Sequence, residues 1–228
     1  MGLDLKLPED SQYEQVIPEG FPDWEEKMNK WGNMMLDGCF VAAQMAARGL
    51  GLKDDAFTSI MEGGNHLLAP TGSDLIKNGK GTIFASVHND LNFLTIHGKS
   101  RFPGLYTWLR DGRKMPVKVP DGCLLLQAGL EFEILTAGYI MAGLHEVVYA
   151  EGTEAAVAKA KEEIANGKDR VLWRISSTMF SHIRSNVIME PIGGMKLLDG
   201  TISKAGDPKY PPIKAIDHVI NTLKKIDL

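Results

Sequence analysis

The chain has 228 residues, enough for one sizeable domain with a single hydrophobic core. Its composition is that of an ordinary globular protein, with 44% hydrophobic residues, 24% charged residues and a formal net charge of -4 at pH 7. Mild acidity and scattered basic residues argue against nucleic acid or an anionic membrane as a partner. The two cysteines, Cys39 and Cys123, are too few for a disulfide scaffold and form no CxxC pair of the kind found in zinc or redox sites.

The first residues, MGLDLKLPEDSQYEQ, are polar and acidic and lack the apolar stretch of a signal peptide. No apolar run in the sequence approaches the length needed to cross a bilayer. We therefore expect a cytoplasmic protein in a reducing compartment, with neither a membrane nor a nucleic acid among its partners. The sequence leaves the oligomeric state open.

The N-terminal part of the chain has helical periodicity. Between residues 22 and 50, large apolar side chains recur at roughly helical intervals, which predicts a long helix that Gly49 and Gly51 end. A second, short helix is expected over residues 54–62, before Gly63 and Gly64.

From residue 65 to residue 149 the pattern changes to short β-prone stretches. Each is bounded by Gly, Pro, Asp or Asn; they are TIFASVH, LNFLTIHG, GLYTWLR, KMPVKVP, CLLLQAG and HEVVYA. Asp111-Gly112, between two of them, is typical of a hairpin turn. A helix that begins at Thr153 and ends at Gly167 follows, and then the strand-like VLWRISSTMFSHI and a C-terminal amphipathic helix.

This order of elements predicts one domain of mainly β structure with flanking helices (α+β). Many short strands with evenly spaced turn signals favour a sandwich or barrel, such as a jelly roll, over alternating β–α units. We expect a helical part over residues 1–64, a jelly-roll core over 65–192 and a tail with a helix over 193–228. The helices are expected to pack on one side of the core.

A histidine–carboxylate pair is the first candidate for chemistry. His88 and Asp90 lie two residues apart in the strand-like ASVHNDLNF, and alternation along a strand puts both side chains on one face. One imidazole and one carboxylate are two members of a facial triad, which a histidine from a neighbouring strand would complete. The pair alone is a weak signal, because Asp90 is equally compatible with a turn or surface carboxylate.

The sequence around this pair resembles the isopenicillin N synthase-like family of Fe(II)/2-oxoglutarate-dependent dioxygenases. HNDLNFLTIHG is similar to the family's metal-binding strand, and PGLYTWLRDGRKMPVKVPDGCLLLQAG is similar to its run of hairpin and apolar strands. EFEILTAGYIMAGLHEVV resembles the segment that ends in the distal metal histidine, here His145. Arg174-Ile175-Ser176 resembles the family's RxS motif. The resemblance covers residues 65–191.

The resemblance implies a double-stranded β-helix, the jelly roll of this family, that holds Fe(II) through His88, Asp90 and His145. The implied activity is oxidation of a small organic substrate by hydroxylation, desaturation or ring closure, with dioxygen consumed and 2-oxoglutarate decarboxylated to succinate. Two alternatives stay open. One is an Fe(II) oxidase of the same fold that does not use 2-oxoglutarate, and the other is a non-catalytic jelly-roll protein that binds a ligand or a partner.

For 2-oxoglutarate, the resemblance implies that Arg174 and Ser176 bind the C5 carboxylate. A planar, always-charged guanidinium suits a carboxylate, and the serine hydroxyl adds a donor two residues along the same strand face. Arg170 is the rival for this role, but it has Leu172 rather than a serine two residues further on.

Substrate contacts are expected near His66, Phe93, Tyr106 and Met179. His97 and His182 fall in expected strands, where either would touch substrate if its side chain faced the pocket.

Three features depart from the family. The helix between His145 and Arg174 is longer than the family usually has there, and it could act as a lid or as an oligomer contact. The family's tyrosine pair after an asparagine is replaced by Asn65-His66-Leu67. Family members also begin with a longer N-terminal region, so we expect a natural short form, a truncated chain or a fragment.

Overall fold

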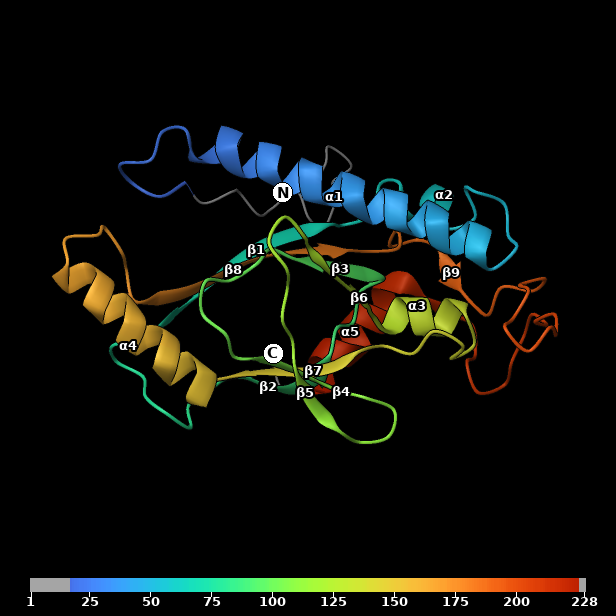
Figure 1. Cartoon of the computed structure of the whole chain (residues 1–228). Helices are drawn as coiled ribbons and strands as arrows, with labels where there is room; N and C mark the ends of the chain where they lie inside the picture. Colours follow the sequence, from blue (N-terminus) through green and yellow to red (C-terminus); the bar gives the residue numbers. More distant parts are fainter. Residues whose placement is uncertain (1–16, 226–228) are drawn as a thin grey trace.

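Two four-stranded antiparallel sheets face each other at the centre of the fold, in a computed structural model that describes residues 17–225 (Figure 1). The first sheet has the order β1–β8–β3–β6, with bounds Leu67–Asp74, Trp173–Ser181, Leu94–His97 and Leu125–Ala128. The second has the order β2–β7–β4–β5, with bounds Ile83–Asn89, Leu144–Val148, Leu105–Trp108 and Lys114–Pro116. Strands that follow each other in sequence repeatedly change sheet, as in a jelly roll. The expected mainly β fold with flanking helices is confirmed. The polar N-terminal segment discussed above lies outside the described residues.

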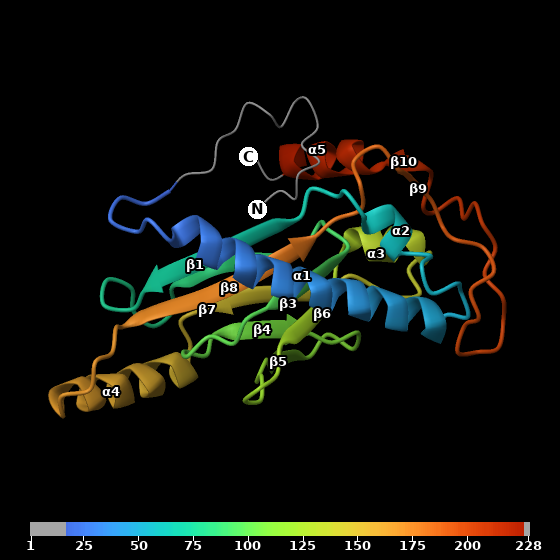
Figure 2. The ribbon, with the colours of Figure 1, turned by 90° about the horizontal axis from the view of Figure 1, so that it is seen from above.

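The long helix α1 (Trp24–Gly49) lies across the outer face of the first sheet (Figures 1 and 2). Its buried side chains, among them Met35 and Cys39, recur at helical spacing and form the stripe that faces the strands. A glycine brings helix and sheet close together, since a Cβ added at Gly38 would lie 3.1 Å from the side chain of Ile96. The helix expected over residues 22–50 is therefore confirmed. It packs on the outer face of the first sheet and not in the space between the two sheets.

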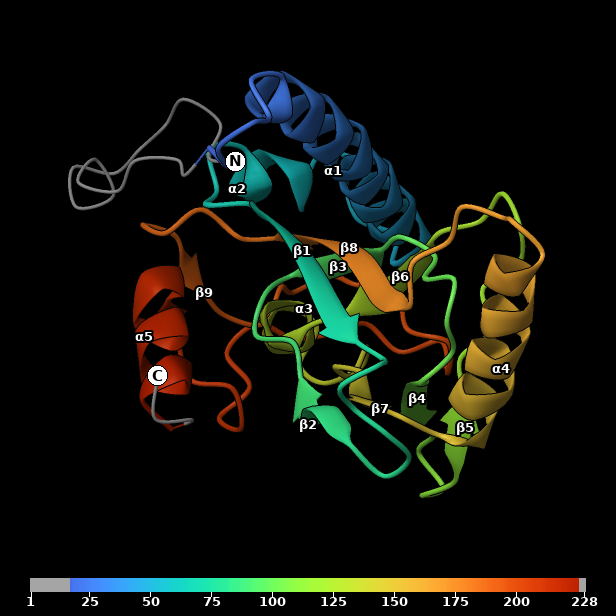
Figure 3. The ribbon, with the colours of Figure 1, turned by 90° about the vertical axis from the view of Figure 1, so that its left-hand side faces the viewer.

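Smaller elements close the main core and form a second one. Helices α2 (Thr58–Met61) and α3 (Leu130–Leu135) contribute to the main core, and β9 (Ile188–Met189) pairs with β10 (Ile213–Lys214) just before α5 (Ala215–Lys225). Helix α4 (Glu151–Ala165), inserted between β7 and β8, contributes Val157 to a separate cluster with Phe102 and Tyr149. In Figure 3, α4 and α5 stand on opposite sides of the sheets. Within residues 17–225, no helix combines the length and the hydrophobicity that crossing a membrane requires.

Three elements differ from expectation. Strand β1 was not expected because it contains Pro70 and Gly72, both unfavourable inside a sheet. It forms an edge of the first sheet and pairs only with β8, and an edge strand tolerates a proline that lacks the N–H of a central strand. The helix expected over residues 54–62 is shorter, because only Thr58–Met61 is helical. Helix α3 was not foreseen; it is a single turn and a half after the glycine that ends β6.

Candidate metal centre and adjoining cavity

The pairing of β2 with β7 brings two histidines face to face. His88 on β2 and His145 on β7 are direct partners in the antiparallel register, so their side chains project from the same face of the second sheet. Their ring centroids are 4.2 Å apart. Asp90 follows immediately after β2, where the chain turns towards β3. The sheet register thus supplies the neighbouring histidine that the HxD spacing requires.

The three side chains converge on one point. Nε2 of His88 and Nε2 of His145 each lie 3.7 Å from Oδ1 of Asp90, and the three ligand atoms all lie within 4.8 Å of one another. In the described part of the chain, no other three His, Cys, Asp or Glu residues gather in this way. Asp90 and His145 are buried, whereas the His88 side chain is 44% exposed. The cluster is therefore open to solvent on the His88 side.

Hydrogen bonds to the backbone orient both imidazoles. Nδ1 of His88 lies 2.6 Å from the carbonyl oxygen of Ser86, and Nδ1 of His145 lies 3.3 Å from that of Gly143. When Nδ1–H of His88 donates to the Ser86 carbonyl, Nε2 of His88 carries a lone pair that faces Asp90. Burial lowers the pKa of His145, although the charge of Asp90 opposes this shift, which favours the neutral, metal-binding form.

The other carboxylate oxygen of Asp90, Oδ2, accepts hydrogen bonds from neighbouring side chains. Oδ2 accepts hydrogen bonds from the Thr95 hydroxyl at 2.7 Å and from the Gln127 side-chain amide at 3.1 Å. The amide nitrogen of Gln127 also lies 2.8 Å from Nδ1 of His145, so one side chain contacts two of the three candidate ligands. Partners of this kind fix the orientation of metal ligands.

This donor set fits a divalent metal ion. Two neutral imidazoles and one carboxylate on one side of a site, with space on the other, are the ligands of a non-haem Fe(II) facial triad. Bonds of about 2.1 Å meeting at right angles would place the donors about 3 Å apart, so a small inward rotation of the side chains is enough for them to close on an ion.

A cavity of about 460 Å³ adjoins the three residues and runs between the two sheets. The inward-facing residues of β8, Arg174, Ser176 and Thr178, line one wall, and His88 and His145 line the other. A volume of this size accommodates a small organic molecule. The cavity therefore joins the candidate metal centre to the residues of the RxS motif.

Arg174 is a buried cation without a counter-charge. Its relative exposure is 7%, its Nε has no hydrogen-bond partner, and within residues 17–225 its guanidinium makes no ion pair. Desolvation lowers its pKa. A buried, unpaired charge is costly, and such groups are usually paired when the protein is functional. The cavity thus presents a strong binding position for an anion.

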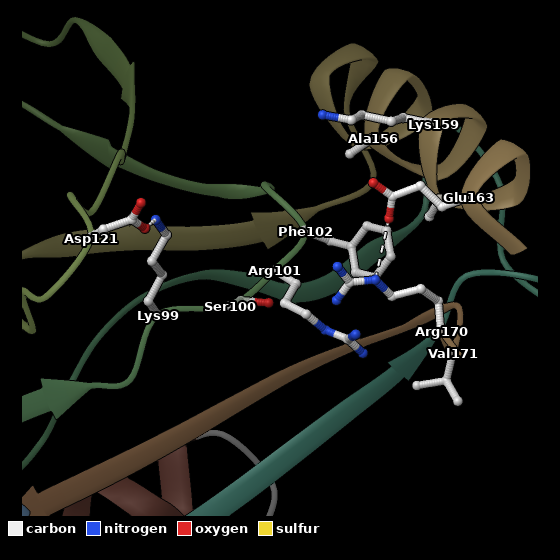
Figure 4. Close-up of a pocket in the computed structure, with 11 residues that line it drawn as sticks. Lys99, Ser100, Arg101, Phe102, Asp121, Ala156, Lys159, Glu163, Arg170 and Val171 are labelled. Atoms are coloured by element: carbon white, nitrogen blue, oxygen red, sulfur yellow. Dashed lines mark hydrogen bonds and ion pairs between the residues drawn. The ribbon is translucent and has the colours of Figure 1, made fainter. Parts of the chain in front are cut away.

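Arg170, the alternative to Arg174 for this role, already has an ion-pair partner outside this cavity. Its Nε lies 3.2 Å from a carboxylate oxygen of Glu163 on α4, and this pair lies in a neighbouring cavity (Figure 4). Arg170 does not line the cavity that holds the three candidate ligands.

The four residues expected as substrate contacts lie outside this cavity. Phe93 and Met179 are buried in the main core, where Met179 faces α1. His66 packs edge-on against Phe40 of α1. Tyr106 lies under the Lys114 ammonium, which ion-pairs with Glu146. None of the four lines the cavity.

One histidine that the sequence left open does line the cavity. His97, on β3, contacts the ring of His145 edge-on, and its Nε2 is buried without a partner among the described residues. Burial lowers its pKa to about 4, so the ring is neutral at neutral pH. His182 instead packs against the buried Glu131. Thr95 and Gln127 were not foreseen, because their contacts with Asp90 depend on which strands pair. Arg101 and Lys118 also line the cavity and were not foreseen, because they lie in segments that only the fold brings to it.

Comparison with known proteins shows which solved structures share this fold. The sequence matches no protein-family model, and no curated protein is similar enough to count as a match. A putative 2OG-Fe(II) oxygenase family protein from Caulobacter crescentus superposes with a TM-score of 0.75 at 22% identity, over 93% of this chain and 63% of that one.

Two ligand-bound structures are similar as well. A full-length protein of Neurospora crassa, bound to alpha-KG and thymine, has a TM-score of 0.68 at 17% identity over 93% of this chain and 60% of its own. JOX2, bound to 2OG, Fe and JA, has a TM-score of 0.66 at 18% identity over 90% and 54%. The chain thus spans about six-tenths of the length of the structures it matches. It has the fold that these oxygenase structures share.

Proposed function

We propose that the chain is a non-haem Fe(II)/2-oxoglutarate-dependent dioxygenase that oxidises a small organic substrate. One observation carries the proposal: the buried, unpaired Arg174 faces the same cavity as His88, Asp90 and His145. A cation for the co-substrate and a triad for the metal are the two parts that this chemistry needs, and they meet between the two sheets of the matching fold.

Each residue has a defined task. His88, Asp90 and His145 would hold Fe(II) on one side and leave the cavity side free for ligands. The Arg174 guanidinium would bind the C5 carboxylate of 2-oxoglutarate through two parallel hydrogen bonds, and the Ser176 hydroxyl would donate a further one. With iron and dioxygen bound, decarboxylation of 2-oxoglutarate to succinate supplies the oxidising power for hydroxylation, desaturation or ring closure. The chain's own contribution is to position the ligands and to exclude water.

The unpaired guanidinium bears on the alternatives as well. It argues only weakly against an Fe(II) oxidase without a co-substrate, because the carboxylate of a substrate could pair with Arg174 in place of 2-oxoglutarate. A non-catalytic ligand-binding protein would need neither the convergent donors nor the hydrogen bonds from Thr95 and Gln127 that occupy the outer oxygen of Asp90. Both features favour a working metal centre with an anionic co-substrate.

The test is succinate formation from 2-oxoglutarate in the absence of other substrates, with iron added or omitted. We compare the wild-type protein with His88→Ala and with the control His182→Gln, whose histidine lies outside the cavity. The proposal expects iron-dependent succinate from wild type and control and none from His88→Ala. Folding of each variant is checked by circular dichroism.

Negative outcomes separate the alternatives. Folded wild-type protein that binds no iron would support the non-catalytic function. Iron binding without a visible charge-transfer band on addition of 2-oxoglutarate under anaerobic conditions would support the oxidase that does not use this co-substrate.

A further inference from the structure

We infer that the substrate is an apolar organic acid whose carboxylate is bound by Arg101 and Lys118. The inference rests on the proposed function, because it concerns the space that remains once iron and 2-oxoglutarate are placed. It is carried by the distribution of charge in the cavity and by the apolar surface next to the two cations.

Positive charge dominates the cavity lining. Four cationic side chains stand there against a single carboxylate, that of Asp90; they are Lys99, Arg101, Lys118 and Arg174. Lys99 is already paired, because its ammonium contacts the carboxylate of Asp121. Among residues 17–225, three unpaired cations, Arg101, Lys118 and Arg174, therefore stand against the one carboxylate of Asp90.

The iron and the co-substrate do not change this excess. Fe(II) carries two positive charges and 2-oxoglutarate two negative ones, and the charge of Asp90 cancels that of Arg174. Arg101 and Lys118 are left over. In the described part of the chain, neither side chain has an ion-pair or hydrogen-bond partner, and both are exposed where they line the cavity. A ligand with one or two negative charges would be attracted to them.

The two cations share the cavity with an apolar lining. Arg101 belongs to the segment after β3 and Lys118 to the segment after β5, and both side chains are exposed. Apolar side chains line the same cavity: Phe102, Leu105, Val117, Val119, Leu125 and Val147. An acid whose carboxylate is bound by the two cations would place its apolar part against these side chains.

The neighbouring cavity extends the positive surface. About 530 Å³ in volume, it lies between α4 and the segment 99–102, and Arg101 lines both cavities. Figure 4 shows Arg101 and Arg170 reaching into this space from different segments, with Arg170 held by Glu163. Lys159 of α4 adds a further cation, with no ion pair among the described residues. This arrangement would raise the local concentration of anions near the metal cavity.

The test uses acids and their neutral amides as matched probes. Protein loaded with Mn(II) and saturating 2-oxoglutarate is titrated with octanoate, phenylacetate and 3-phenylpropionate, and with the primary amide of each. Broadening of the probe's proton resonances by Mn(II) reports binding near the metal. We expect at least one acid to bind ten or more times as tightly as its amide.

Variants then locate the carboxylate. Arg101→Gln and Lys118→Gln should each weaken binding of that acid about tenfold, since each loses a charge-assisted hydrogen bond. Arg101→Lys should keep most of the affinity because it keeps the charge. Lys53→Gln, which removes an exposed lysine outside both cavities, should bind the acid like the wild type.

Three results would overturn the inference: amides that bind as tightly as acids, an Arg101→Gln variant with unchanged acid affinity, or no binding by any acid. Displacement of 2-oxoglutarate by an acid would also count against it, because the acid would then occupy the co-substrate position. Broadening of the 2-oxoglutarate resonances is recorded in the same samples. Its absence would contradict the proposed function and is distinguishable from a failure of the acid probes.

Discussion

The Thr95 hydroxyl donates a hydrogen bond of 2.7 Å to Oδ2 of Asp90, the oxygen that does not face the two histidines. Both residues are buried, at 0% and 5% relative exposure, so water does not compete for this bond. Together with Gln127, Thr95 uses the acceptor capacity of Oδ2 and turns Oδ1 towards His88 and His145. The orientation of one candidate metal ligand thus depends on a residue that would not itself bind the metal.

Replacing this hydroxyl should weaken iron binding. Thr95→Val keeps the side-chain shape but removes the donor, and loss of such a partner typically costs about 10–100-fold in metal affinity. We expect the dissociation constant for Fe(II), measured by anaerobic titration, to rise by about tenfold or more. Thr136→Val is the control, since Thr136 is equally buried and hydrogen-bonded but lies in the segment after α3, away from the cavity. Equal iron affinity in both variants would contradict the positioning role.

The choice between Arg174 and Arg170 gives a second prediction. Arg174→Lys keeps a positive charge but loses the planar fork, so the KM for 2-oxoglutarate should rise about tenfold or more while iron affinity stays within about twofold. Arg170→Lys should leave this KM nearly unchanged, because its exposed pair with Glu163 lies outside the metal cavity. Succinate formation over a range of 2-oxoglutarate concentrations measures both. A larger effect at Arg170 would reverse the assignment.

The sequence was informative where local spacing determines geometry. His88 and Asp90 lie two apart on an expected strand, and the order of motifs supplied His145, which the register then places opposite His88. The long helix was equally predictable, since its apolar periodicity alone identifies the face that packs on the sheet.

Two residues expected as substrate contacts lie outside the cavity because the face of a strand that a residue occupies depends on its alternation along the strand and on packing. Along β8, Arg174 and Ser176 face the cavity, so Met179, at an odd-numbered position, faces α1. On β4, Thr107 pairs with His145, whose side chain faces the cavity, and the next pair is Tyr106 with Glu146. Because neighbouring residues of a strand point to opposite faces, the Tyr106 side chain points away from the cavity. The alternation of side chains along each strand would have excluded both residues from the cavity, once one cavity-facing residue of each strand was known.

The loops were beyond prediction for another reason. Arg101 and Lys118 follow different strands and line one cavity only because β3 and β5 belong to sheets that face each other. No local sequence pattern predicts that these two segments border the same space.

Acid should destabilise the fold through His66. Burial lowers the pKa of this histidine to about 4 from an ordinary value of 6.5, and Nδ1 accepts a hydrogen bond from the backbone N–H of His182, which requires the unprotonated ring. A folded-state pKa below the unfolded value means that the unfolded chain binds the proton more readily. The contribution of the neutral His66 ring to the free energy of unfolding is therefore fully present above about pH 6.5 and is lost as the pH falls towards about 4.

His66→Asn should remove this pH dependence, because the asparagine oxygen can accept the same hydrogen bond without titrating. Between about pH 7.5 and about pH 5, the free energy of unfolding of the wild type should fall more than that of the variant, by an amount on the order of 2 kcal/mol. Guanidinium titrations at the two pH values measure the difference. Parallel losses in the two proteins would show that His66 contributes nothing to acid sensitivity.

Gly129 should be irreplaceable, because the chain passes the metal-binding turn there at very close range. A Cβ at this position would lie 2.0 Å from the carbonyl oxygen of Asn92, which is backbone and has little freedom to move. The Gly129 N–H donates to the Phe93 carbonyl oxygen, and the next N–H, that of Leu130, donates to that of Asp90 at 2.8 Å. A methyl group would force these segments apart and shift Asp90 away from the histidines.

We therefore expect Gly129→Ala to lower the free energy of unfolding by about 3 kcal/mol and to weaken Fe(II) binding as well. Gly79→Ala is the matched control, since a Cβ there meets nothing within 4 Å and the backbone does not have a positive φ. Guanidinium unfolding and anaerobic iron titration measure the two effects. A variant that keeps its stability but binds iron weakly would show that the added methyl group displaces only Asp90. If neither the free energy of unfolding nor the iron affinity changed, the close packing of this turn would be contradicted. Loss of both together is the result the structure requires, because the hydrogen bonds that hold Gly129 and Leu130 also hold the turn that carries the carboxylate.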